Sequence, residues 1–227
     1  MARRTPDREY IPPVQTLQVR YAKRGRMRFA SHRDFQRAWE RALRRAGVPM
    51  AYSAGFSPHP KISYAGAAPT GAASEAEFLE ISVLEVLDPD ALRADLDDAL
   101  PPGLDVVGIV EAQGSLVDSL VASRWRIEWP VPVQDAVAAF EAVATVEVER
   151  VTKAGRRMID VRALCSDLEL PSGSTLEVTV RHAEPTPRPA EVVAGIRSVA
   201  PDLPDVPVLA TRLAQGSPVA GGVAPPF

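Results

Sequence analysis

The 227-residue sequence has little of several residue types, and each shortage excludes a class of protein. Cys165 is the single cysteine, which excludes an intramolecular disulfide framework and any cluster or zinc site built from several thiolates of this chain. No apolar run approaches the roughly 18 residues that a membrane span needs. No apolar segment follows the basic N-terminus, as it would in a secretory signal. We therefore expect a cytoplasmic protein with no membrane partner.

The remaining composition is that of an ordinary globular protein with an uneven charge distribution. Hydrophobic residues make up 46% of the chain and charged residues 24%, unlike a disordered chain. Residues 1–70 hold 14 basic and 4 acidic side chains, a balance of +10, whereas the rest of the chain has a balance of −13. This asymmetry predicts a surface in the N-terminal part that faces a polyanion.

Hydrophobic periodicity predicts the order β-α-β-β-α-β for the first half of the chain. A strand pair around Gly25, or one long bent strand, is expected over 17–30. Ser31, with Asp34 three residues later, starts an amphipathic helix that ends at Gly47. The other expected elements are strand-like segments over 50–56 and 61–67, a strand over 77–86, a helix over 89–100 and a strand over 104–111.

The second half partly repeats this order. Its expected strands cover 124–130, 146–152, 157–164, 175–182 and 206–214, and its expected helices cover 133–144 and 190–199. We therefore predict an α+β protein with two tandem ferredoxin-like domains, the second with an added strand. The expected divisions are a flexible leader over 1–15, a basic domain over 16–111, a linker over 112–123, a second domain over 124–215 and a disordered tail over 216–227.

The helix that follows Ser31 places apolar residues on one face and arginines on the other. Guanidinium groups match phosphate geometry bidentately, so this face and its neighbours predict a nucleic-acid surface. The alternatives are a merely solvated helix face or a surface that docks an acidic protein. Interleaved aromatic residues at 21, 52, 56 and 64 stack bases in the first interpretation or belong to the core in the others. The predicted nucleic-acid-binding residues are Arg20, Lys23, Arg24, Arg26, Arg28, Ser31, His32, Arg33, Arg37, Arg41, Arg44, Arg45, His59 and Lys61.

His32 and His59 lie in predicted loops beside hydroxyl and carboxyl groups. We favour structural roles or simple ligand contact for both. General acid–base catalysis and a metal site shared with Asp34 stay as lesser alternatives, and we expect no resident metal or cofactor. His182 and the Cys165 thiol are expected to be structural and buried. Neighbouring carboxylates such as Glu75 and Glu77 are expected to be solvated.

Two segments are more specific than composition: RFASHRD at 28–34 and AYSAGFSPHPKIS at 51–63. With the arginine-rich helix between them, they resemble the radical SAM-associated (radical SAM-linked) protein family. Weaker matches follow at 160–162 and 188–192, and the resemblance covers about 15–214. The chain departs from the family pattern at Arg33, where leucine is common, and at Ala163, where proline is common.

The resemblance implies a companion of a cobalamin-binding-type radical SAM protein, with RNA modification as the inferred setting. The chain lacks the three cysteines that would hold the cluster, so any radical chemistry belongs to that partner. We expect a non-catalytic accessory subunit that binds RNA or another polyanion. The alternatives are a metal-independent endoribonuclease using His32 and His59, and a scaffold that docks an acidic protein.

Overall fold

The computed structural model describes residues 10–54, 56–152 and 155–227, and it confirms the α+β class. The chain divides into two compact units. The first contains residues up to Thr70, Glu77–Val117 and Phe227, and the second contains Gly71–Ala76 and Asp118–Pro226. None of the helices in the described residues is long and apolar enough to cross a membrane.

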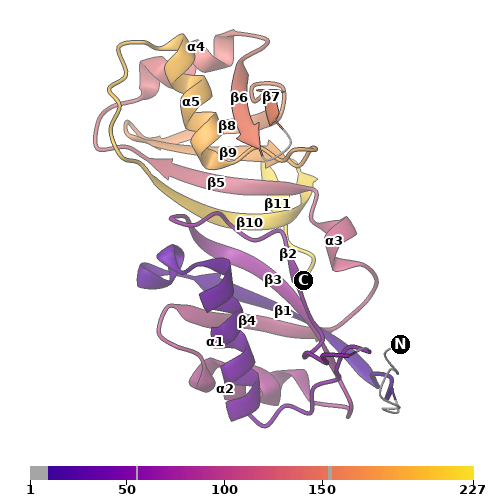
Figure 1. Ribbon diagram of the computed structural model, residues 1–227. Coiled ribbons are helices and arrows are strands. Elements are labelled where there is room, and N and C mark those ends of the chain that lie inside the picture. Colours follow the sequence, from indigo (N-terminus) through magenta and orange to yellow (C-terminus); the bar gives the residue numbers. More distant parts are fainter. Residues whose placement is uncertain (1–9, 55, 153–154) are drawn as a thin grey trace. The chain divides into compact units, whose positions relative to one another are not determined.

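The first unit is a four-stranded sheet with two helices. Its elements in chain order are β1 (Gln15–Lys23), the 3-10 helix η1 (Gly25–Phe29), α1 (His32–Arg45), β2 (Ile62–Ala65), β3 (Ala73–Val83), α2 (Pro89–Ala99) and β4 (Leu104–Glu111). The strand order is β4-β1-β3-β2, and β1 pairs with β4 and β2 with β3 antiparallel. Helices α1 and α2 lie on the same side of these strands (Figure 1).

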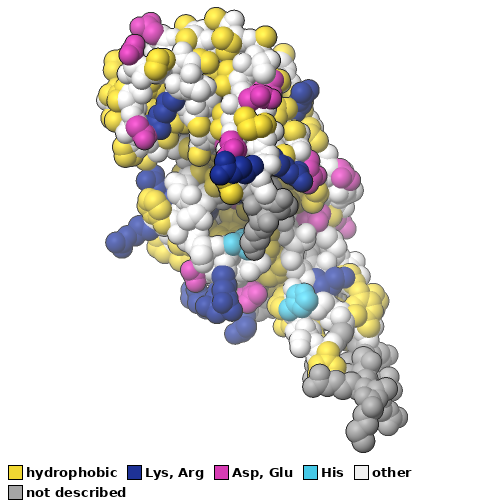
Figure 2. All heavy atoms as spheres, turned by 45° about the horizontal axis from the view of Figure 1, so that its top comes forward, with side chains coloured by type: hydrophobic (Ala, Val, Ile, Leu, Met, Phe, Trp, Pro, Cys, Tyr) yellow, Lys and Arg dark blue, Asp and Glu magenta, His cyan; other side chains and the backbone are white. Residues whose placement is uncertain are grey.

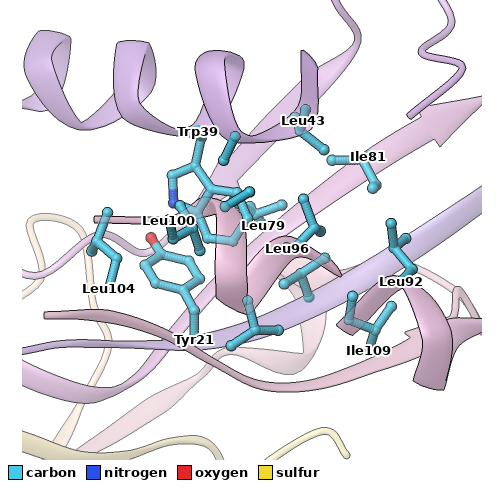
Figure 3. Close-up of a cluster of buried hydrophobic side chains, with 14 of the residues drawn as sticks. Tyr21, Trp39, Leu43, Leu79, Ile81, Leu92, Leu96, Leu100, Leu104 and Ile109 are labelled. Carbon is cyan, nitrogen blue, oxygen red and sulfur yellow. The ribbon is translucent and has the colours of Figure 1, made fainter. Parts of the chain in front are cut away.

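The core of the first unit explains the position of α1. Trp39 and Leu43 are fully buried and point from α1 toward Leu79 and Ile81 of the sheet (Figure 3). Tyr21 packs edge-on against Trp39, with 5.0 Å between the ring centroids. Burying such a side chain contributes about 1.5–3 kcal/mol, so the apolar face of α1 fixes which of its residues face outward.

The ends of α1 follow the sequence signals. The Ser31 hydroxyl accepts a hydrogen bond from the Asp34 amide at 3.2 Å, which caps the helix as predicted. The helix ends where Gly47 adopts a φ of +66°, a conformation that L side chains rarely take. The amide of Val48 then donates to the Leu43 carbonyl at 3.0 Å.

The second unit also combines antiparallel strands with helices. In chain order it contains β5 (Ala122–Glu128), α4 (Gln134–Ala142), β6 (Glu147–Thr152), β7 (Gly155–Asp160), β8 (Cys165–Ser172), β9 (Thr175–Arg181), α5 (Pro189–Val199), β10 (Leu209–Val219) and β11 (Gly222–Ala224). Its strand order is β10-β5-β9-β8, and β6 and β7 form a separate hairpin. The start of β3 pairs with β10 in parallel through Ala73 and Ser74. A short helix, α3 (Leu116–Ser119), precedes β5.

Several expected elements differ in the structure. The strand expected over 17–30 ends at Lys23, because Gly25 turns the chain with a φ of +52° into η1. In the described part of 50–56, which is expected to be strand-like, the structure has isolated bridges, from Met50 to Val83 and from Tyr52 to Pro60.

Other differences concern the second unit and the ends of the chain. The strands expected over 146–152 and 157–164 form the β6–β7 hairpin, which is separate from the larger sheet. Strands β8 and β11 were not expected, so the described residues of this unit form two strands more than predicted. The expected linker over 112–123 contains α3 and the start of β5. Residues 216–227, expected to be disordered, complete β10 and form β11. In the expected leader, residues 1–9 lie outside the described residues, and β1 already begins at Gln15.

Candidate nucleic-acid interface

Seven arginines of the first unit form what we call the arginine face. They come from η1 and from the outer side of α1, and all but the half-buried Arg28 are exposed. With 1.5 Å of rise per residue, the part on α1 extends over about 18 Å. Figure 2 shows Lys and Arg side chains gathered near one of the visible histidines. The arginine face consists of Arg26, Arg28, Arg33, Arg37, Arg41, Arg44 and Arg45.

Within the described ranges, the structure gives the arginine face no neutralising partner. Among the residues that the structure describes, none of its seven members forms an ion pair. Arg28 instead lies over the ring of Phe29, with 4.6 Å between the guanidinium carbon and the ring centroid. Clustered like charges repel one another, so a bound polyanion would lower the electrostatic energy of this face.

Three other cations predicted to contact RNA are partly buried or already have partners. Arg24 forms an ion pair with Asp105 at 2.8 Å, and Arg20 is half-buried on β1. Lys23 is only 6% exposed, and its ammonium donates to the Ala68 carbonyl at 3.2 Å. These three cations are therefore not part of the open arginine face.

Lys23 lines a cavity of about 250 Å³ in the first unit. Glu77, expected to be solvated, is 1% exposed and lies in the same wall, because strand β3 turns this carboxylate inward. Its Oε2 accepts a hydrogen bond from the Ala68 amide at 3.0 Å. The cavity is lined by Tyr21, Lys23, Ala30, His32, Phe35, Ala67, Ala68, Pro69, Thr70 and Glu77.

His32 is the first residue of α1 and stands exposed at this cavity. Its ring stacks toward Phe35 at 6.5 Å between centroids and meets Tyr64 edge-on at 5.5 Å. Ser31 is occupied by the helix cap, because its hydroxyl also donates to the Asp34 carboxylate at 2.7 Å. The side chain of His32 is thus held by aromatic contacts and remains open to a ligand.

His59 has a separate environment in the loop before β2. Its Nδ1 lies 2.9 Å from the Ser53 hydroxyl, and its amide donates to the same oxygen at 3.2 Å. The neighbouring Lys61 donates to the Tyr10 hydroxyl at 3.3 Å. The described residues contain no group of three or more His, Cys, Asp or Glu side chains able to hold a metal ion. The metal site considered for His32, Asp34 and His59 is therefore not formed.

The aromatic residues considered for base stacking divide between core and surface. Tyr21 is buried in the core, and Tyr64 is half-buried, with burial and nearby Glu40 raising its hydroxyl pKa. Tyr52 and Phe56 are 50% and 64% exposed. Phe29 is 60% exposed beside Arg28, and sequence reasoning missed it, although it lies inside the RFASHRD motif.

Cys165 and His182 lie in the second unit with structural contacts, as expected. Cys165 is buried, and burial raises its thiol pKa to about 12. His182 donates from Nδ1 to the Leu120 carbonyl at 2.7 Å, and its Nε2 accepts from the Ser123 hydroxyl at 2.7 Å. Ser123 is only 1% exposed, so this Ser–His pair lies beneath the surface, which agrees with the expected structural role.

Three comparisons with known proteins give one family match, over more than half of the chain. A family described as "Uncharacterized protein conserved in bacteria (DUF2344)" matches residues 16–189. No protein in the curated set matches the chain. Among solved structures, the crystal structure of an unknown protein from Galdieria sulphuraria is 14% identical, covering 87% of this chain and 98% of that chain with a TM-score of 0.27.

Proposed function

The chain belongs to a family of uncharacterized proteins conserved in bacteria, and we propose that it binds RNA through its arginine face as an accessory subunit of a radical SAM enzyme. The observation that carries the RNA-binding part is the set of seven arginines that form no ion pair with any residue in the part of the chain that the structure describes. Arginine is the residue best suited to bidentate phosphate contacts.

Exposed aromatic side chains favour single-stranded RNA over a purely electrostatic partner. Phe29 lies beside Arg28, and Tyr52 and Phe56 are at least half exposed. Unpaired bases stack on such rings, with about 1–3 kcal/mol per base. An acidic protein would use the arginines but would gain little from these aromatic surfaces.

The radical SAM part of the proposal rests on the resemblance of the two motifs and of the arginine-rich helix between them. One buried cysteine is available on this chain, whereas a radical SAM cluster needs several thiolate ligands. The cluster and the radical chemistry would therefore belong to the partner, and this chain would hold the RNA.

The proposal also treats the two units as variants of the ferredoxin-like fold. The first unit has the order β1-α1-β2-β3-α2-β4 with strands arranged β4-β1-β3-β2. Without the β6–β7 hairpin, the second has the order β5-α4-β8-β9-α5-β10 with strands arranged β10-β5-β9-β8. These element orders support the proposal, because the ferredoxin-like fold has the order β-α-β-β-α-β, although fold alone does not decide function.

Fluorescence anisotropy with a labelled single-stranded RNA at several salt concentrations tests the proposal. We expect binding that weakens steeply with salt, since each phosphate neutralised contributes about 0.7 to the slope of log K against log salt. Competition by polyglutamate distinguishes the proposal from the scaffold alternative. The length of the RNA after incubation without metal distinguishes it from the endoribonuclease alternative. Absence of RNA binding, with polyglutamate bound instead, would replace the proposal with the scaffold.

A further inference from the structure

The cavity beside the start of α1 is a second feature of the first unit that the arginine face does not explain. Its volume of about 250 Å³ lies just below the range of about 300–1,000 Å³ for sites that take a whole drug-sized ligand. A single ring system fits this volume better than a longer chain. The ligand would therefore enter as one group of a larger molecule or as a small molecule.

The walls of the cavity combine aromatic and charged side chains. Tyr21 and Phe35 line it from the core side, and His32 lines it from the exposed side. Lys23 and Glu77 supply a cation and a carboxylate from adjacent strands of the sheet. The charged side chains offer a hydrogen-bond donor and an acceptor to the edge of a planar ligand. The aromatic rings offer surfaces on which its faces can stack.

The loop that closes the cavity is held by the same charged pair. The Ala68 carbonyl accepts from Lys23, and the Ala68 amide donates to Glu77. Both backbone groups of one residue are thus tied to side chains of the sheet. This arrangement holds the backbone of Ala68 in place as a preformed part of the wall, which reduces the ordering cost of binding a ligand there.

The cavity adjoins the arginine face along the chain. Arg33 directly follows the cavity residue His32, and Arg28 lies two residues before the cavity residue Ala30. Residues so close in the chain lie close in space. A phosphate bound by either arginine would therefore place its own nucleotide near the cavity. Many planar ligands would suit the walls of the cavity. The nearby arginines favour one that is attached to a phosphate backbone.

We propose that the cavity takes one unpaired nucleobase of an RNA strand whose phosphates lie on the arginine face. The inference rests on the proposed RNA binding and deepens it, because it adds a contact that depends on a base. The base stacks against His32, and its polar edge faces Lys23 and Glu77. Single-stranded RNA is generally recognised by such splayed bases, whereas phosphate contacts alone fix position.

Two synthetic strands with identical phosphates separate the cavity from the arginine face. One is an eight-residue strand of abasic nucleotides, and the other carries a single 2-aminopurine in the middle. A single base prevents binding in a shifted register. We expect the wild-type protein to bind the base-bearing strand about five- to tenfold more tightly, with quenching of the 2-aminopurine fluorescence on stacking.

The substitution Ala67→Phe places a large ring at an exposed position of the cavity wall, and His32→Ala removes the stacking surface. Both should bring the affinity ratio of the two strands close to one and abolish quenching. Ala94→Phe, on the exposed side of α2 outside the cavity, is the matched control and should keep the ratio. Circular dichroism checks the folding of each variant.

The outcomes distinguish the two proposals. If the wild type binds both strands equally with a steep salt dependence, the base pocket is wrong and RNA binding through the arginine face stands. If the ratio persists in both cavity variants, the base binds elsewhere and the pocket is again wrong. If neither strand nor an ordinary RNA binds, the proposed function and the pocket fail together.

Discussion

Cys165 shows how burial decides the reactivity of a single side chain. Cys165 is the first residue of strand β8 and is 5% exposed. Burial is the largest influence on its pKa, which is raised to about 12, while nearby Arg162 opposes the shift and Asp160 adds to it. Because the thiolate is the reactive form, very little of it exists at neutral pH.

We therefore predict that Cys165 does not react with a thiol reagent in the native protein at pH 8. In 6 M guanidinium chloride the same residue should react fully, because the unfolded thiol is exposed and has an ordinary pKa. Mass spectrometry after brief labelling measures both. Rapid stoichiometric labelling of the folded protein would show that the thiol is accessible.

The environment of His182 links its protonation to folding. Burial lowers its pKa from 6.5, the nearby Arg212 adds to this, and the hydrogen bond to the Leu120 carbonyl opposes it. The unfolded state therefore binds a proton more readily than the folded state. The free energy of unfolding must then fall as the pH drops below about 6.5.

We predict that this loss is at most about 1.4 kcal/mol per pH unit. Urea unfolding at several pH values between 7.5 and 5 measures it. In the variant His182→Gln the pH profile should be flatter than in the wild type, whatever the change in absolute stability. Parallel profiles for the two proteins would mean that His182 has the same pKa folded and unfolded.

At the scale of elements, the sequence predicted best where local signals and burial coincide. The caps of α1 and α2 were predicted correctly, because Ser31 and Asp88 satisfy amide groups that any helix start leaves unpaired. The apolar spacing of α1 also predicted its buried face correctly. The same periodicity predicted that the arginines lie on the opposite, exposed face of α1.

The elements that sequence reasoning missed depend on tertiary contacts. Strand β8 lacks a clear alternation and contains Pro171, and it forms because β9 supplies a partner edge. The glycine- and proline-rich end of the chain becomes ordered because β10 pairs with β5 and then with β11. The burial of Glu77 likewise depends on a strand register and a loop that a single sequence does not reveal.

Helix α2 offers a direct test of capping. The Asp88 carboxylate accepts hydrogen bonds from the amides of Asp90 and Ala91, both at 2.9 Å. We predict that Asp88→Ala lowers the free energy of unfolding by about 1 kcal/mol, whereas Asp88→Asn, which keeps an accepting oxygen, costs only a few tenths. Chemical denaturation measures both. Equal losses in the two variants would contradict a capping role.

At the scale of the whole molecule, charge is divided along the chain. The first 70 residues carry +10 and the rest carries −13, and the described part of that basic segment belongs to the first unit. Polyanion binding should therefore be a property of the first unit. The total charge of the chain is close to neutral and does not reveal this basic segment. The sequence predicted this division, but it could not show which arginines already have partners.

The salt dependence of RNA binding in two matched triple variants tests the central claim most directly. Changing Arg37, Arg41 and Arg44 to Gln removes three charges, whereas changing them to Lys keeps the charges at the same positions. Gln and Lys have helix propensities similar to that of Arg, so both variants should fold. Anisotropy titrations of one labelled single-stranded RNA at several salt concentrations give the slopes.

The account predicts that the Gln variant reduces the slope of log K against log salt by about two, at roughly 0.7 per phosphate, and weakens binding at low salt. The Lys variant should keep a slope close to that of the wild type, with a smaller loss of affinity because Lys lacks the bidentate fork. A Gln variant that is folded and retains the wild-type slope would show that the arginine face does not bind RNA.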